Sequence, residues 1–134
     1  MTFSAILAGE TAVPPNSSQA AGSAVFILAD TDEFTYQVDL RGTLSSNETS
    51  CTINGPSLRN GTAPVLYTLP PGAHKEGSVG VLSEAEIQQL MGGEWYCNLS
   101  TENYPNGELR CQIENVVATR ERTWAAVKAL YRSR

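Results

Sequence analysis

The single histidine of this chain, His74, limits the acid–base chemistry that the sequence offers. A serine or cysteine nucleophile needs a base within hydrogen-bond reach, and one histidine in the polar stretch PPGAHKEG does not build the usual triad. We interpret His74 as a solvated loop residue. The sequence also has no glycine-rich turn between a strand and a helix of the kind that binds nucleotide phosphates. These residues predict a protein that is not an enzyme.

Carboxylates gather in two places where they could bind a metal or act in catalysis. Asp30, Asp32 and Glu33 could hold a calcium ion, but their spacing matches no known calcium loop, and a solvated turn explains them better. Glu84 and Glu86 stand at the expected start of a helix, where the helix dipole favours acidic side chains, so they do not indicate a catalytic pair. We predict neither a metal nor a cofactor.

The three cysteines are Cys51, Cys97 and Cys111, an odd number that permits at most one internal disulfide. If STENYPNGE connects a hairpin, Cys97 and Cys111 lie equally far from Tyr104 and face each other on its apolar side. Buried, reduced thiols fit a chain without an export signal, and this is the interpretation we favour. A bridge between Cys97 and Cys111 would instead indicate export.

Short apolar or alternating runs, broken about every ten residues by turn formers, predict an all-β sandwich or barrel. The turn residues ADTDE join two of the runs into a hairpin. Ser83 and Glu86 form a capping-box pattern that predicts a short connector helix ending at Gly92 and Gly93. The expected strands cover residues 2–8, 22–28, 34–40, 50–54, 65–69, 77–82, 95–100 and 108–116.

The last sixteen residues, TRERTWAAVKALYRSR, differ from the rest of the chain, so we divide it into a β-domain, 1–118, and a basic amphipathic helix, 119–134. This helix could dock on its own domain or on another subunit. Its apolar stripe and its basic residues are the predicted partner-binding side chains. They are Trp124, Val127, Leu130 and Tyr131, with Arg120, Arg122, Lys128, Arg132 and Arg134.

The formal net charge is −5, and most of the basic residues lie in the last segment, so the body is acidic. An acidic body disfavours nucleic acid as its partner, since phosphate binding requires a basic face. No apolar run is long enough to cross a membrane, and the start of the chain shows no secretory signal. We therefore expect synthesis in the cytoplasm, with an extracellular location as the alternative if the sequence has been trimmed.

Several segments, taken in order, resemble the chordin-domain (CHRD) family: FSAILAGETAVPP, AGSAVFIL, FTYQVDLRG, INGP, LSEAEIQQLMGGEWYCNLST and YPNGELRCQI. The resemblance implies an immunoglobulin-like antiparallel sandwich or barrel without enzymatic activity. Members commonly carry histidines where this chain has Thr52, Asn54 and Ser100, and three converging imidazoles would suit copper or zinc. Hydroxyls and an amide are poor ligands for either ion, so the scaffold is expected to remain while the metal site is lost.

Two classes of function follow. The first is a structural or assembly protein, a homo-oligomer that binds copies of itself or a larger lattice through the 119–134 segment. A phage virion protein that decorates or cements a capsid, or belongs to a tail, is one example. Apolar anchors such as Trp124 and Tyr131 would dominate that contact. The alternative, which the resemblance implies, is an exported ligand- or metal-binding module.

Overall fold

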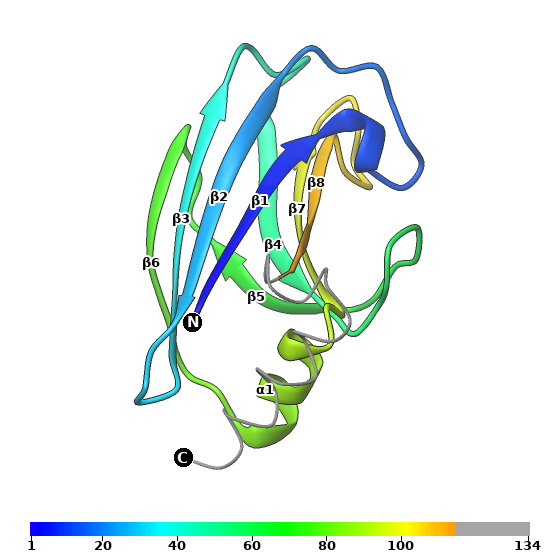
Figure 1. The fold of residues 1–134 in the computed structure, drawn as a ribbon. Coiled ribbons are helices and arrows are strands. Elements are labelled where there is room, and N and C mark those ends of the chain that lie inside the picture. Colours follow the sequence, from blue (N-terminus) through cyan, green and yellow to red (C-terminus); the bar gives the residue numbers. More distant parts are fainter. Residues whose placement is uncertain (115–134) are drawn as a thin grey trace.

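A computed structural model describes residues 1–114, which form one antiparallel sheet of eight strands in the order β5-β4-β7-β8-β1-β2-β3-β6. The sheet curls until it nearly closes into a barrel (Figure 1). The predicted all-β class is thus confirmed. The elements are β1 Thr2–Ala8, the 3-10 helix η1 Gly9–Thr11, β2 Ala21–Leu28, β3 Glu33–Arg41, β4 Glu48–Asn54, β5 Val65–Leu69, β6 His74–Val81, α1 Glu84–Met91, β7 Trp95–Thr101 and β8 Leu109–Ile113.

The barrel interior is built from apolar residues at alternate positions along the strands. In β3, Phe34, Tyr36 and Val38 are buried, because side chains two residues apart share one face of a strand. Phe26 of β2 stacks on Phe34 at 5.7 Å between ring centroids, and Trp95 of β7 meets the same ring edge-on at 5.8 Å. Such ring pairs add stability beyond the apolar area that they bury.

The predicted connector helix is α1, which lies at one end of the barrel (Figure 1). The predicted capping box is present: the backbone N–H of Ser83 donates to Glu86 Oε1 at 2.9 Å, and the N–H of Glu86 donates to Ser83 Oγ at 3.2 Å. Ile87 and Leu90 are buried on the inner side of the helix. The helix therefore closes this end of the core.

Six strands differ from the sequence prediction at one or both ends, and the largest differences, of three residues, are at the start of β6 and the end of β8. β6 begins at His74 rather than at residue 77, so His74 lies on a strand and our loop assignment was wrong, although its side chain is exposed. The ammonium of Lys75 binds the carbonyls of Pro70 and Gly72, which closes the turn early and allows pairing to begin at His74. The last strand, expected over 108–116, is observed as Leu109–Ile113.

The barrel wall is paired unevenly. β1 and β8 are paired only between Ala8 and Arg110, so the two strands separate toward the start of β1 and the end of β8. β5 and β6 form the two edges of the sheet. In the part of the chain that the structure describes, no helix is both long and apolar enough to span a membrane. The predicted helix over 119–134 lies outside the described residues.

Candidate functional site

A polar concavity of about 500 Å³ lies on the outer face of β4 and β7. It contains the three positions at which the sequence suggested a lost metal site, Thr52, Asn54 and Ser100. We call this concavity the β4–β7 pocket. Six of its side chains come from the two strands, and its walls are residues 13, 62, 63, 65, 105 and 106 of the surrounding loops and β5. The six strand residues are Ser50, Thr52, Asn54, Tyr96, Asn98 and Ser100.

Strand register sets the order of these side chains along the pocket. Ser50 lies opposite Ser100, Thr52 opposite Asn98, and Asn54 opposite Tyr96. Ser100 is therefore four residues along the ladder from Asn54, a distance of about 13 Å at ~3.3 Å per residue. The three family positions thus share one pocket but are spread along its long axis.

A hydrogen-bonded chain holds one end of the pocket. Thr52 Oγ1 donates to Asn54 Oδ1 at 2.5 Å, and Asn54 Nδ2 donates to the carbonyl of Ala63 at 3.0 Å. The hydroxyl of Tyr96 accepts from the N–H of Ala63 at 2.8 Å. These side chains attach the connection between β4 and β5 to the outer face of the barrel. Hydroxyl and amide groups do not fit copper or zinc, so the geometry and the donor set both argue against a metal here.

The other end of the pocket is open to a ligand. Among the described residues, none makes a hydrogen bond with the side-chain hydroxyl of Ser50 or Ser100, although Ser100 is only 5% exposed. Asn98, between them and Tyr96, donates from Nδ2 to the carbonyl of Asn106 at 3.2 Å. The described residues that line the pocket include none that is charged at neutral pH. The site therefore offers hydrogen bonds without a charge preference.

Arg110 and Gln112 of β8, which stand opposite Asn98 and Tyr96 in the ladder, hold the wall of the pocket from one side. The guanidinium of Arg110 donates to the carbonyl of Gly61 at 2.5 Å and lies 3.6 Å from the centre of the Tyr96 ring. Gln112 Nε2 donates to the carbonyl of Ser57 at 2.7 Å. Burial lowers the pKa of Arg110, and carbonyl and amide oxygens rather than a carboxylate accept its hydrogen bonds. These residues position the loop between β4 and β5, and so the mouth of the pocket.

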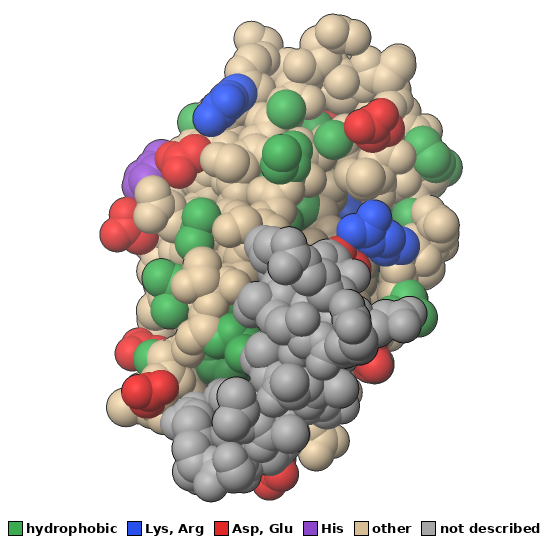
Figure 2. Space-filling view, viewed as in Figure 1, with side chains coloured by type: hydrophobic (Ala, Val, Ile, Leu, Met, Phe, Trp, Pro, Cys, Tyr) green, Lys and Arg blue, Asp and Glu red, His purple; other side chains and the backbone are tan. Residues whose placement is uncertain are grey.

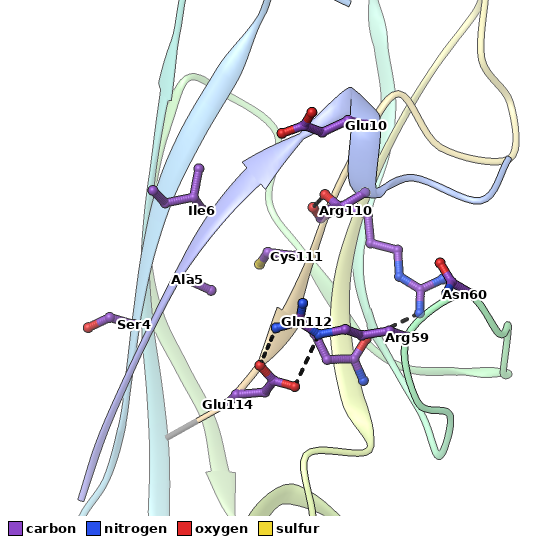
Figure 3. Close-up of a pocket in the computed structure, with 11 residues that line it drawn as sticks. Ser4, Ala5, Ile6, Glu10, Arg59, Asn60, Arg110, Cys111, Gln112 and Glu114 are labelled. Carbon is purple, nitrogen blue, oxygen red and sulfur yellow. Dashed lines mark hydrogen bonds and ion pairs between the residues drawn. The ribbon is translucent and has the colours of Figure 1, made fainter. Parts of the chain in front are cut away.

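A second concavity, of about 320 Å³, lies where β1 and β8 separate (Figure 3). Arg59 and Glu114 pair across its rim at 2.6 Å, and the hydrogen bond that Arg59 donates to Glu114 raises the pKa of Arg59. The guanidinium of Arg110, on the same side, is already bound by carbonyls. Of the charged groups that line this concavity, Arg59, Arg110 and Glu114 are thus engaged within the protein, and the fourth, Glu10, is exposed.

The three cysteines form a row of free thiols inside the barrel. Cys97 lies opposite Cys111 in the ladder, as the hairpin predicted, and Cys51 Sγ is 3.8 Å from Cys97 Sγ. The hydrogen bond between Cys51 and Cys97, together with burial, raises the pKa of the Cys51 thiol. The contact with Cys111 and burial likewise raise the pKa of Cys97. A high pKa disfavours the thiolate, so these side chains pack as small apolar groups.

A buried carboxylate that we had not singled out, Glu108, joins three segments at the end of the barrel far from α1. It accepts hydrogen bonds from Ser18 Oγ at 2.6 Å, Ser45 Oγ at 2.7 Å and Thr101 Oγ1 at 2.9 Å. Burial by itself would raise the pKa of Glu108, but these hydrogen bonds outweigh burial and hold the pKa below its usual value. The role is structural, and the motif YPNGELR, which carried the family resemblance, contained the signal for it.

The remaining carboxylates that we considered are also engaged. Glu86 accepts a hydrogen bond of 2.5 Å from the Tyr67 hydroxyl in addition to its capping role. Burial, and to a smaller extent this hydrogen bond, raises the pKa of Tyr67 to about 12. Glu33 accepts from Ser78. In residues 1–114, no group of histidine, cysteine and acidic side chains is arranged to hold a metal ion.

Charged side chains on the face shown in Figure 2 are scattered among polar and apolar ones, without a broad basic surface among the described residues. This arrangement fits the prediction that the body does not bind nucleic acid, and it does not test it. The nine predicted partner-binding residues all lie outside the described residues. They are Trp124, Val127, Leu130, Tyr131, Arg120, Arg122, Lys128, Arg132 and Arg134.

Comparison with known proteins agrees with the motifs that carried the family resemblance. Residues 3–113 match the family model described as the CHRD domain. Chordin from Xenopus laevis is 28% identical over 115 residues, and Chordin from Danio rerio is 31% identical over 115 residues. Each alignment covers 84% of this chain, and the chain spans 12% of the length of these relatives. No solved structure matches significantly.

Proposed function

The chain belongs to the CHRD domain family, and from this membership we propose that it is a non-catalytic binding module of an exported protein. The β4–β7 pocket is its ligand site in this proposal. The observation that carries the proposal is the pocket itself, in which Ser50 and Ser100 present hydroxyls without protein partners. Both hydroxyls are accessible from the pocket, so a ligand can replace the water that they would otherwise bind.

Family membership supports the exported module over the assembly protein, which the sequence alone had favoured. The relatives are animal proteins, and no finding points to a capsid or a tail. Self-association through Trp124 and its neighbours stays a prediction, because those residues lie outside the described part of the chain. The absence of enzymatic activity is likewise supported at the level of the family.

The test is a search for small ligands by amide chemical-shift mapping. Titrating the ¹⁵N-labelled full chain with sets of neutral, cationic and anionic fragments should perturb the amides of β4 and β7 with at least one neutral compound. Cu²⁺ and Zn²⁺ should leave these amides unchanged, because hydroxyls and amides are poor ligands for both ions.

A variant with a filled pocket provides the control. Ser50 is half-buried at the pocket mouth, so Ser50→Trp should abolish the perturbation, whereas Ser4→Trp, at an exposed serine of β1, should not. The proposal fails if no fragment perturbs the pocket amides, or if Ser50→Trp binds as well as Ser4→Trp.

A further inference from the structure

The shape of the β4–β7 pocket selects a long, narrow ligand. Its three facing pairs, from Ser50 and Ser100 to Asn54 and Tyr96, extend along about 13 Å of strand at ~3.3 Å per residue. This length exceeds a single pyranose ring and accommodates two. The volume, about 500 Å³, lies within the range of small-molecule sites.

The lack of charge selects a neutral ligand. A sulfated or carboxylated sugar would need a lysine or arginine to meet its charge, and Arg110, which stacks on the far side of Tyr96, is already held by Gly61, Leu58 and Gln112. Burying an unpaired charge in the pocket would carry a large desolvation penalty. Anionic glycans are therefore disfavoured.

The hydrogen-bonding groups match hydroxyls better than they match a peptide. The hydroxyls of Ser50 and Ser100 can each donate and accept, as sugar hydroxyls do. Asn98 lines the pocket with them, its amide nitrogen bound to the Asn106 carbonyl and its Oδ1 lying against Gly107. An extended peptide that binds by adding a strand needs a free sheet edge. β4 is paired with β5 and β7, and β7 with β4 and β8, so neither strand offers such an edge.

The walls supply the apolar contacts that a sugar ring also needs. Val13, Val65 and Pro105 flank the polar floor of the pocket. Their side chains can pack on the C–H faces of a pyranose while the floor binds its hydroxyls. We propose that the β4–β7 pocket binds a neutral saccharide about two pyranose units long. This inference rests on the proposed binding function and names the ligand class of the same site.

The experiment is a chemical-shift titration of the full chain with maltose, cellobiose, lactose and N,N′-diacetylchitobiose. The constituent monosaccharides and a sulfated heparin disaccharide are titrated for comparison. At least one neutral disaccharide should perturb the amides of Ser50, Thr52, Asn98 and Ser100. Its monosaccharide should bind about tenfold more weakly, since losing a few hydrogen bonds removes about 1.4 kcal/mol. The heparin disaccharide should not bind.

Two small variants connect the binding to the named hydroxyls. Ser100→Ala and Ser50→Ala each remove one hydroxyl without adding volume, and each should weaken the best disaccharide by about two- to tenfold. Ser4→Ala, on the outer face of β1, is the matched control and should leave the affinity unchanged. Equal affinity of Ser100→Ala, Ser50→Ala and the unmodified chain would overturn the inference.

The two proposals fail in different ways. If no saccharide perturbs the pocket amides but another neutral fragment does, the saccharide inference is wrong and the binding module stands. The saccharide inference is also wrong if the heparin disaccharide binds more tightly than every neutral sugar. If neither saccharides nor fragments perturb these amides, both proposals are wrong.

Discussion

Replacing Glu108 by glutamine tests how a buried carboxylate holds the end of the barrel together. Its oxygens accept from Ser18 Oγ, Ser45 N, Ser45 Oγ and Thr101 Oγ1, at 2.6, 3.0, 2.7 and 2.9 Å. A hydrogen bond to a charged group contributes about 1.5–3 kcal/mol and a neutral one about 0.5–1.5 kcal/mol. Neutralising the acceptor therefore removes about 1 kcal/mol from each of these bonds.

Part of this loss is offset, because the glutamine has no charge to desolvate. We expect Glu108→Gln to lower the free energy of unfolding by about 2–3 kcal/mol at pH 7. Urea denaturation monitored by far-UV circular dichroism measures this free energy of unfolding. Glu33→Gln is the matched control, since Glu33 accepts a hydrogen bond from Ser78 at the exposed surface and should cost less than about 0.5 kcal/mol.

The pH dependence gives the sharper test. The pKa of Glu108 is lowered in the folded state, so its stabilisation is present above the unfolded-state pKa, about 4.3, and is lost as the pH falls through the folded-state pKa. The difference between the parent and Glu108→Gln should therefore shrink as the solution is acidified from pH 7 toward pH 3. A difference that is the same at both pH values would refute the charged hydrogen-bond account.

Three further predictions concern the surroundings of the pocket. Arg110→Lys keeps the charge but loses the planar guanidinium that binds the Gly61 and Leu58 carbonyls, so the free energy of unfolding should fall by about 2–3 kcal/mol. The Ala63 amide, in the loop that Arg110 holds, should then exchange faster with deuterium. Unchanged exchange would contradict the loop-holding role. Gly107→Ala should cost about 1–3 kcal/mol in urea denaturation, because φ is +131° and a Cβ would lie 2.3 Å from Asn98 Oδ1; a neutral effect would argue against this packing. Hydrogen bonds from His74 to Asp39 and Glu76 raise the pKa of His74, so the small stabilisation is present below pH ~6.5 and is lost as the pH rises through the folded pKa. NMR titration should show Asp39→Asn lowering that pKa, and an unchanged value would exclude the pairing.

Local features were readable from the sequence where local physics decides them. The alternation of Phe34, Tyr36 and Val38 predicts a strand with one buried face, and the pair Ser83 and Glu86 predicts the start of α1. The equal spacing of Cys97 and Cys111 around their turn predicts that they face each other. Each of these inferences needs only strand or helix period and turn chemistry within one short segment.

The candidate site was only partly readable. The family pattern drew attention to Thr52, Asn54 and Ser100, and the structure places all three in one pocket. The sequence could not show that Ser50 and Asn98 share this pocket, nor that Ser100 stands four residues along the ladder from Asn54. Those facts depend on the register between β4 and β7, which about forty residues of intervening chain separate.

The surroundings of His74 and Cys51 could not be read from the sequence either. His74 stands in a stretch rich in proline and glycine and reads as a loop, but Lys75 binds the carbonyls of the turn and Asp39 faces His74 across the ladder. Cys51 has no partner nearby in the sequence, yet it lies beside Cys97. The sequence by itself determined the β class, the helix cap, the inward faces and the family. Tertiary structure alone decided which polar side chains meet on the barrel wall, because pairing between distant strands brings them together.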